Sequence, residues 1–454
     1  HVCYLMMRCF YGGRKMKTYD LLVIGFGKAG KTLAAKMSSL GKKVALVEES
    51  SSMYGGTCIN IGCIPTKTLI HAAENHLTFE QAMAEKEVVT HRLNQKNKAN
   101  VVNAGVDLYD AKASFVSNKV IKIVAGEDSE RLTADTIVIN TGAISNRLPI
   151  PGLKESKNVF DSTGIQKLET LPQRLGIIGG GNIGLEFASL YANLGSKVTV
   201  FETANRILPR EEDIVAQLAK EYMEEDGISF VLNAQINALE NDEEDNVILS
   251  NHGQKMSFDA VLYATGRKPN ITDLGLENTD IVVTDRGAIE VDDYCETSVP
   301  NVYAVGDVNG GLQFTYVSLD DYRIVFNKLT GQSDYNASQR NNIPTTLFIN
   351  PALARVGLTE KEAAEANLPY KANELMVSAM PRAHVNGNLR GIYKVIVNEK
   401  TQDILGATLF GEGAQENINL IKLAMDNHIP YTYIKNQIFT HPTMAENLND
   451  VFNF

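Results

Sequence analysis

Two cysteines separated by four residues, Cys58 and Cys63, are the first side chains in this sequence that could do chemistry. They lie in the segment GGTCINIGCIPTK, residues 55–67, which joins a glycine turn to the start of a predicted helix. This spacing permits a strained disulfide that is readily reduced. The pair therefore predicts thiol redox chemistry.

A metal site is the alternative role for the same cysteines, because His71 and His76 follow them. Two cysteines and two histidines could form a zinc-like ligand set. The histidines, however, lie in the run TLIHAAENHL, which reads as a continuation of the helix, where surface or packing roles are more common. We therefore predict no metal ligands and keep the metal site as an open alternative.

A strand–turn–helix–strand pattern precedes the cysteines. Residues 19–48 begin with the apolar run YDLLVIG, continue through a helical segment, and end on the strand KKVALVE with Glu48 in last place. The turn between the first strand and the helix contains three spaced glycines, Gly25, Gly27 and Gly30. This is the pattern of a dinucleotide-binding unit.

The same pattern returns later in the chain. The strand LGIIG leads into Gly179, Gly181 and Gly184, a helical LEFASLYANLG follows, and SKVTVFE ends on Glu202. In both copies the acid lies 18 residues beyond the third glycine, from 30 to 48 and from 184 to 202. A single glycine motif would be weak evidence, but two copies in full context predict two dinucleotide-binding folds.

Each element of this pattern has a physical role in holding a dinucleotide. The first glycine permits a tight turn, the second lets the backbone approach a pyrophosphate, and the third lets the helix pack on the strand. The pyrophosphate then meets the helix N-terminus, and the terminal acid accepts a ribose hydroxyl. A protein that holds two dinucleotides most simply passes electrons between them, so the repeat predicts an oxidoreductase.

The second acid also indicates which nicotinamide nucleotide is the electron donor. A carboxylate at Glu202 accepts the free 2′-hydroxyl of NADH and repels the 2′-phosphate of NADPH. Arg206 and Arg210 lie close enough in the sequence to soften this preference. We predict NADH as the donor, and use of NADPH stays open.

Composition limits the class of protein. With 454 residues the chain is long enough for two to four domains, and its net charge of −11 leaves no concentrated basic surface for a nucleic-acid partner. No apolar run approaches the roughly 18 residues that suggest a membrane span. Five cysteines are few for this length, which favours a reducing cytoplasm. We predict a cytoplasmic enzyme with no nucleic-acid or membrane partner.

Residues 1–15, HVCYLMMRCFYGGRK, are expected to lie outside the fold. They lack a long apolar region followed by a small-residue cleavage site. We interpret them as a tag or an upstream extension before Met16, and Cys3 and Cys9 share that interpretation.

The segment GGTCINIGCIPTK resembles the active-site segment of the class I pyridine nucleotide-disulfide oxidoreductases, whose members include glutathione reductase and lipoamide dehydrogenase. The resemblance extends from Met16 to Phe454. It also includes ATGRKPN at residues 264–270, a flavin segment at 297–307 that ends in YAVGD, and HPTMAE at residues 441–446. Together these motifs imply a flavoprotein disulfide reductase.

The resemblance places FAD on the first glycine motif and the nicotinamide nucleotide on the second. It implies that Glu48 binds the adenosine ribose of FAD and that Asp307 binds the ribityl and phosphate region. The other cofactor contacts that it implies, beyond the six glycines and Glu202 named above, are Gly56, Thr57, Lys67, Ala113, Thr141, Gly142, Phe314, Thr315, Ile183 and Gly266.

The same resemblance gives the two sulfurs unequal roles. It implies that Cys63 lies against the flavin as a charge-transfer thiolate and that Cys58 faces the substrate as the interchange thiol. It further implies that Lys67 and Glu186 pair near the flavin N5, where the hydride arrives.

His441 and Glu446 complete the predicted site. An imidazole can take the proton of a thiol and return it to a leaving group at neutral pH, and Glu446 can orient the ring and stabilise its charged form. In the family this pair comes from the other subunit, so the resemblance implies a homodimer with a shared active site. His384 is interpreted as structural, and Cys295 as buried filler.

Three further segments resemble a narrower bacterial group, the hypothiocyanous acid reductases and reactive-chlorine resistance flavoproteins. These segments are VIGFGKAGKTLA, GDVNGGLQFTYVSLDDYRIV and IFTHPTMAENLNDVF. This resemblance implies that the substrate is a small oxidant, hypothiocyanous acid (HOSCN). The alternatives are a copper(II) or mercury(II) reductase, a lipoamide dehydrogenase, and a redox-sensing module without turnover.

The predicted fold is α/β, with two Rossmann-like dinucleotide-binding domains and a C-terminal α+β dimerisation domain. We expect the FAD domain at 16–150 and 271–340, with the nicotinamide-nucleotide domain at 151–270 inserted between these parts. The dimerisation domain is expected at 341–454. Proline and glycine at 149–152 and in ATGRKPN mark the crossing points.

Overall fold

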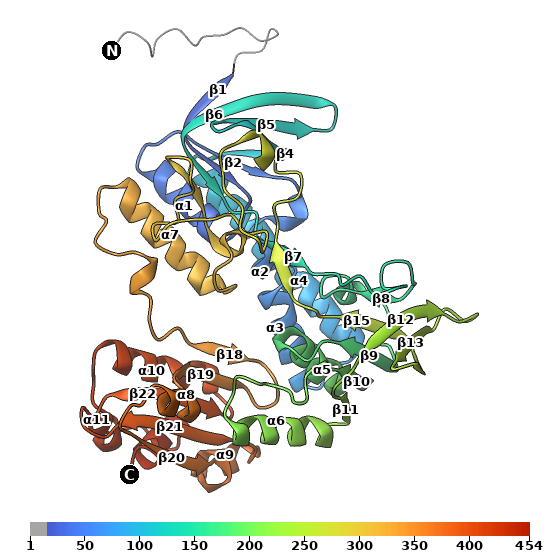
Figure 1. Ribbon diagram of the computed structural model, residues 1–454, viewed down its shortest axis with the longest axis vertical. Coiled ribbons are helices and arrows are strands. Elements are labelled where there is room, and N and C mark those ends of the chain that lie inside the picture. The colour runs from blue at the N-terminus through green and yellow to red at the C-terminus, as the bar shows by residue number, and fades with distance from the viewer. Residues whose placement is uncertain (1–15) are drawn as a thin grey trace. The chain divides into compact units, whose positions relative to one another are not determined.

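The computed structural model describes residues 16–454, which it divides into two compact units (Figure 1). The first unit contains residues 16–68, 83–146 and 267–339 of this part of the chain, and the second contains residues 69–82, 147–266 and 340–454. The predicted extension at 1–15, with Cys3 and Cys9, lies outside the described residues.

A mixed sheet forms the centre of the first unit. Its order is β3-β2-β1-β6-β5-β4, with β17 also paired to β6. The pairs among β1, β2, β3, β6 and β17 are parallel, and β4, β5 and β6 form an antiparallel extension. The strands are β1 (Lys17–Ile24), β2 (Val44–Glu48), β3 (Asp107–Asp110), β4 (Lys112–Ser117), β5 (Val120–Ala125), β6 (Asp128–Ile139) and β17 (Val302–Ala304).

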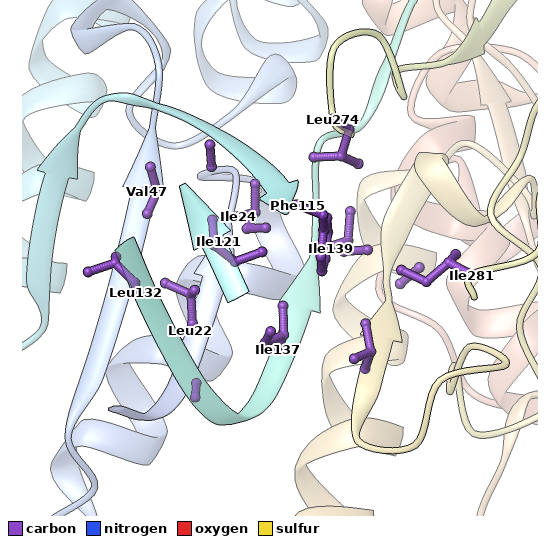
Figure 2. Packing of buried hydrophobic residues seen from close by; sticks show 14 of the residues in the cluster. Leu22, Ile24, Val47, Phe115, Ile121, Leu132, Ile137, Ile139, Leu274 and Ile281 are labelled. Carbon is purple, nitrogen blue, oxygen red and sulfur yellow. The ribbon is translucent and has the colours of Figure 1, made fainter. Parts of the chain in front are cut away.

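Apolar runs in these strands produce the core of the first unit. All five residues of β2 are buried, as expected for a parallel strand covered on both faces. One face packs the cluster in Figure 2, in which Leu22 and Ile139 from adjacent strands lie with Phe115 and Leu274. On the other face, α1 packs beside α7 (Figure 1). The helices and other elements are α1 (Lys28–Ser39), α2 (Thr57–Asn60), α4 (Phe79–Asn103, which begins in the second unit), α7 (Thr315–Leu329), η1 (Ser51–Met53), η3 (Leu276–Asn278), η4 (Gly306–Asn309), η5 (Ala337–Gln339), and the paired strands β7 (Ala143–Ser145) and β16 (Arg267–Pro269).

The second unit begins with another parallel sheet, of order β11-β10-β9-β15-β8. A separate antiparallel sheet, β12-β13-β14, belongs to the same unit. These elements are β8 (Val159–Phe160), η2 (Ile165–Lys167), β9 (Arg174–Ile178), α5 (Asn182–Leu194), β10 (Lys197–Phe201), α6 (Asp213–Glu225), β11 (Ile228–Val231), β12 (Ile236–Asn241), β13 (Val247–Asn251), β14 (Gln254–Phe258) and β15 (Ala260–Tyr263).

The C-terminal part of the second unit is an antiparallel sheet of order β18-β19-β22-β21-β20 with helices packed on it. All seven residues of β21 are buried. These elements are β18 (Thr345–Leu347), β19 (Leu353–Gly357), α8 (Glu360–Glu365), β20 (Tyr370–Met376), η6 (Val377–Ala379), α9 (Pro381–Asn386), β21 (Ile392–Asn398), β22 (Ile404–Phe410), α10 (Ala414–Asp426), α11 (Tyr431–Asn436), η7 (Ala445–Asn447) and α12 (Leu448–Val451). The α/β class with two dinucleotide folds and a C-terminal domain is confirmed.

Two sequence expectations can be compared with these elements directly. The helix that follows the cysteines, α3 (Cys63–Glu74), ends before His76, which has a φ of +60°. His71 is therefore helical and His76 is not, which corrects the expectation that both belong to one helix. Within residues 16–454, no helix is long and apolar enough to cross a bilayer.

Candidate active site

Both cysteines of the redox motif are free thiols at the start of short helical segments in the first unit. Cys58 is half-buried in α2, and Cys63 is exposed at the first position of α3. The Cys63 sulfur lies 3.9 Å from the hydroxyl of Thr315, which begins α7. Two segments that are distant in the sequence, the cysteine motif and the start of α7, thus bring two thiols and a hydroxyl together.

The turn before Cys58 packs closely on the first glycine loop. Gly56 has a φ of +83°, and a Cβ atom there would lie 2.8 Å from the Cα of Gly27. The side-chain amide of Asn60 donates hydrogen bonds to the carbonyls of Tyr54 and Gly56, at 2.9 and 2.8 Å. Glycine is required at this position because any side chain would separate the thiol segment from the nucleotide loop.

The two thiols differ in acidity. A hydrogen bond from Cys63 lowers the pKa of Cys58 to about 6, against the opposing effect of burial, and Thr315 and the positive charges of Lys31 and Lys67 lower it further. The pKa of Cys63 is raised, chiefly because its thiol donates that hydrogen bond. The pair therefore carries one thiolate near neutral pH and shares the remaining proton.

The first glycine motif forms the turn between β1 and α1. Gly27 is the N-cap of α1 and offers no capping side chain, so the helix start can receive an anion. A Cβ atom at Gly25 would lie 2.3 Å from the backbone oxygen of Asn140, and one at Gly30 would lie 2.7 Å from the side chain of Val23. Only glycine fits this cradle, which is what a bound pyrophosphate requires.

Glu48 ends β2 beside this cradle. Its carboxylate accepts hydrogen bonds from the backbone N–H groups of Phe26 and Ser50, each at 3.1 Å. Burial raises its pKa to about 7, and these hydrogen bonds oppose the shift. The acid is thus fixed next to the glycine turn, in position to accept a ribose hydroxyl.

The other predicted flavin contacts lie in several elements and loops of the first unit. Burial raises the pKa of Asp307 in η4, whereas the charge of Arg267 opposes this shift. Thr141 donates a hydrogen bond to the carbonyl of Asn270, which follows β16. The remaining predicted contacts are Thr57 at the start of α2, Lys67 in α3, Ala113 in β4, Gly142 between β6 and β7, and Phe314 at the N-cap of α7.

The second glycine motif forms the turn between β9 and α5 in the second unit. A Cβ atom at Gly179 would lie 2.4 Å from the carbonyl oxygen of Ala264, and one at Gly184 would lie 2.0 Å from that of Gly179. Gly181 differs, because no atom lies within 4 Å of its added Cβ. Gly181 is the N-cap of α5 and Ile183 lies in its first turn, so the open space adjoins a helix N-terminus that could hold a pyrophosphate.

Glu202 follows β10 and accepts hydrogen bonds from the backbone N–H groups of Gly180 and Ala204, both at 2.8 Å. Arg206 points its guanidinium elsewhere, toward the carboxylate of Asp213 at 2.5 Å and the carbonyl oxygens of residues 208 and 211. Gly266, with a φ of +94°, lies after β15. The acid is held beside the second glycine turn, and the guanidinium of Arg206 is already bonded to other groups.

Lys67 and Glu186 belong to different units. Glu186 is buried in α5, where its carboxylate accepts a hydrogen bond from the backbone N–H of Phe348 at 3.0 Å. Their pairing near a flavin remains a prediction.

His441 and Glu446 are brought together in the second unit. The ring Nδ1 of His441 lies 2.7 Å from a carboxylate oxygen of Glu446, whose other oxygen accepts the backbone N–H of Thr443 at 2.8 Å. The hydrogen bond with His441 holds the pKa of Glu446 below its usual range. The side chain of His441 is 69% exposed. His384 lies in α9, with its Nε2 atom 2.9 Å from the carbonyl of Ser378.

Sequence reasoning missed several side chains around the thiols and the glycine loops. Lys31 donates to residues of the thiol turn and of α4, and Tyr316 stacks on Phe314 with ring centroids 5.0 Å apart. Asn140 accepts from Gly30 and donates to the carbonyl of residue 305. Buried Asp321 accepts from Gly306, next to Asp307. The sequence carries no spacing signal for these residues; the partners of Asn140, for example, lie 110 and 165 positions away in the chain.

The alternative of a metal site at the cysteines can be compared with the positions of the side chains that could bind a metal ion. Among residues 16–454, no group of three or more His, Cys, Asp and Glu side chains is positioned to hold a metal ion. His71 is exposed, with its ring near the amide of Asn75.

The chain belongs to the pyridine nucleotide-disulphide oxidoreductases, as two nucleotide cradles and a thiol pair would lead one to expect. The model of that family matches residues 19–321, and the model of its dimerisation domain matches residues 343–452. The protein is therefore an FAD-dependent enzyme of this family that uses a pyridine nucleotide.

Among individual proteins, the chain is 45% identical over 439 residues to RclA of Escherichia coli K12, a probable pyridine nucleotide-disulfide oxidoreductase, covering 96% of this chain and 99% of RclA. It is 33% identical over 451 residues to mercuric reductase of Staphylococcus aureus, and the match covers 95% of this chain and 81% of that reductase. The solved Cu(II) complex of the HOCl-induced flavoprotein disulfide reductase RclA from E. coli matches with a TM-score of 0.95 and 44% identity. The match covers 96% of this chain and 99% of the RclA chain.

Proposed function

We propose that this enzyme reduces HOSCN to thiocyanate with electrons from NADH, through a redox-active Cys58–Cys63 disulfide. The observation that carries the proposal is the acidic Cys58 thiol, which is half-buried beside Cys63 and Thr315. A thiolate is the nucleophilic form of cysteine and can attack the electrophilic sulfur of a small oxidant at neutral pH. The likeness to RclA, named as HOCl-induced, supports a role in oxidant defence.

The chemistry balances with the groups at hand. The Cys58 thiolate attacks the sulfur of HOSCN, and the departing hydroxide takes one proton to leave as water. Cys63 then attacks the Cys58 sulfur, so that thiocyanate leaves and a disulfide forms. His441, oriented by Glu446, can supply or return the proton. Bound FAD supplies the two electrons, taken from NADH, that reduce the disulfide again.

NADH is proposed as the physiological donor. The Glu202 carboxylate next to the second glycine motif would accept the 2′-hydroxyl of NADH and would repel a 2′-phosphate. Arg206, which could have offset that repulsion, is held by Asp213 and two carbonyl oxygens.

A homodimer is proposed because the dimerisation domain matches residues 343–452. In that assembly His441 and Glu446 of one subunit would serve the thiols of the other. Catalysis would then need both chains. A cytoplasmic location is proposed from the few cysteines in the sequence.

The test is steady-state reduction of HOSCN by the purified FAD-loaded enzyme, with NADH and NADPH compared. We expect turnover that is faster with NADH and is abolished in Cys58→Ser. Cys295→Ser serves as the control, because Cys295 is buried in a hydrophobic cluster that contains neither Cys58 nor Cys63. Undiminished HOSCN reduction by Cys58→Ser would contradict the scheme.

Reduction of copper(II) is the second candidate, favoured by the likeness to the solved Cu(II) complex of RclA and by two adjacent free thiols. The same assay, run with copper(II) and with oxidised lipoamide, separates the candidates. A higher kcat/KM for either of these than for HOSCN would replace the proposed substrate.

A further inference from the structure

Lys31 is a charged side chain that contacts the turn before Cys58 and belongs to neither the glycine motif nor the cysteine motif. It lies in the first turn of α1, directly after the third glycine of the first motif. A lysine on the polar face of a helix normally extends into water, but Lys31 is half-buried and its ammonium group has two partners inside the first unit.

Those partners connect the thiol turn to a different helix. The Nζ atom of Lys31 donates to the carbonyl oxygen of Gly55 at 3.2 Å and to the side-chain oxygen of Asn97, in α4, at 2.6 Å. The amide of Asn97 is fixed in turn by donation to the carbonyl of Leu93 at 2.8 Å. Gly55 lies three residues before Cys58, so this contact fastens the segment that carries the thiol.

The turn has little room to adjust without this contact. Gly55 has a φ of +97°, and a Cβ atom there would lie 3.0 Å from the side chains of Asn97 and Ile59. The backbone of the turn is therefore pressed against α4, with Lys31 bridging the two. Without the bridge, the turn would keep its restricted backbone but would lose the hydrogen bond that fixes Gly55 relative to α4.

Lys31 also acts on Cys58 through its charge. Burial and the nearby charge of Lys28 lower the pKa of Lys31 to about 8, whereas a thiolate at Cys58 opposes this shift. Cys63, Thr315 and Lys67 also lower the pKa of Cys58. Lys31 is thus largely protonated at neutral pH, where its charge favours the Cys58 thiolate.

We propose that Lys31 is a positioning residue for the attacking thiol: it ties the Gly55 turn to α4 and holds a positive charge near the Cys58 thiolate. The inference rests on the proposed function for the role of Cys58 as the attacking sulfur. It adds a basic residue to the thiol site from the helix that begins at the first glycine cradle.

The test measures the Cys58 thiolate without any oxidant. The FAD-loaded enzyme is reduced with dithiothreitol and alkylated with iodoacetamide from about pH 5 to about pH 9, and modified Cys58 is quantified by peptide mass spectrometry. We expect Lys31→Met to raise the midpoint of the alkylation profile by about one pH unit. Lys31→Arg should keep the midpoint close to the wild-type value, because it keeps the charge.

Two further variants separate the charge of Lys31 from its tether. Lys31→Gln keeps a hydrogen-bond donor without the charge and should shift the midpoint nearly as far as Lys31→Met. Asn97→Leu removes a tether partner but keeps the charge, and should shift it less. Lys36→Met, an exposed lysine on the same helix, is the matched control and should leave the midpoint unchanged.

A wild-type midpoint in both Lys31→Met and Lys31→Gln, with the FAD spectrum and thermal unfolding intact, would overturn the proposal. An equal shift in Lys36→Met would also overturn it, because the effect would then be one of net charge. Failure of HOSCN as a substrate would leave the alkylation profile unaffected, so the two proposals fail separately.

Discussion

At the scale of single residues, the two sulfurs of the motif are chemically unequal before any substrate arrives. Cys58 is the more acidic thiol because Cys63 donates a hydrogen bond to it. The family resemblance places the charge-transfer thiolate on Cys63. The acidity of the pair alone thus favours a thiolate on Cys58, and a thiolate on Cys63 would need an electron-poor group beside that sulfur, which a bound flavin would supply.

Replacing Cys63 by alanine tests this inequality. The variant removes the donor that is the largest cause of the low pKa, so the pKa of Cys58 should rise from about 6 toward the ordinary thiol value of about 8.5. The folded-state pKa of Cys58 is lowered in the wild type, so its thiolate is present above about pH 6 and is lost as the pH falls through that value. The rate of Cys58 alkylation against pH measures both midpoints.

Thr315→Val is the companion variant, because it removes a weaker hydrogen bond to the same sulfur and should shift the midpoint less. A midpoint in Cys63→Ala that stays near pH 6 would show that fixed positive charges, rather than the neighbouring thiol, set the acidity of Cys58.

At the scale of elements, the strand–turn–helix unit formed by β9 and α5 uses two of its glycines for different purposes. Gly184 allows α5 to pack against the turn, since a Cβ atom there would lie 2.0 Å from a backbone oxygen. Gly181 has open space around it and a φ of −77°, which any residue can adopt. Packing therefore requires glycine at position 184, and access for a ligand is the only evident reason for glycine at position 181.

Alanine substitutions at these two glycines should accordingly have different effects. Gly184→Ala forces a side chain against backbone and should destabilise the fold by about 1–3 kcal/mol, which is measured by thermal unfolding. Gly181→Ala should leave the unfolding temperature unchanged but raise the KM for NADH severalfold, because the methyl group would occupy the approach to the helix N-terminus. A normal KM for Gly181→Ala would show that the nucleotide does not approach that glycine.

The elements also show how far a sequence can predict the site. Both nucleotide units were predictable because glycine turns, apolar strands and terminal acids repeat at fixed spacing. The His441–Glu446 contact joins residues five apart, which local reasoning could anticipate. Lys31, Asn97, Asn140 and Asp321 were missed because their partners are brought together only by packing. The sheets β12-β13-β14 and β18-β19-β22-β21-β20 were not predicted strand by strand, since no motif marks their pairing.

At the scale of the whole molecule, the second unit joins its nucleotide fold to its C-terminal fold through a buried cation. Lys394 in β21 is 7% exposed and contacts the carboxylates of Glu212, at 3.1 Å, and Glu360, at 2.7 Å. Burial opposes its charge, but hydrogen bonds to these two acids outweigh that effect and raise its pKa. Within the second unit, this buried cation therefore links the C-terminal fold, which holds His441, to the fold with the second glycine motif.

If the active site is shared between two subunits, two different inactive subunits should together form an active dimer. If the thiols of one subunit use His441 of the other, the Cys58→Ser and His441→Ala homodimers should each be inactive in HOSCN reduction. In a mixed dimer, one site would contain both defects and the other would contain intact Cys58 and intact His441. Random mixing by unfolding and refolding, or by co-expression, should then restore about a quarter of wild-type activity, because half of the dimers are mixed and half of their sites are intact.

The control is a mixture of Cys58→Ser with Cys63→Ser, whose thiols lie in the same subunit, so no intact site can form and no activity should return. Recovery in the first mixture but not in the control would assign His441 to the partner subunit of each thiol pair. If neither mixture recovers activity although mass spectrometry shows mixed dimers, His441 serves the thiols of its own chain, and the carboxylate of Glu446 orients a base that never crosses the interface.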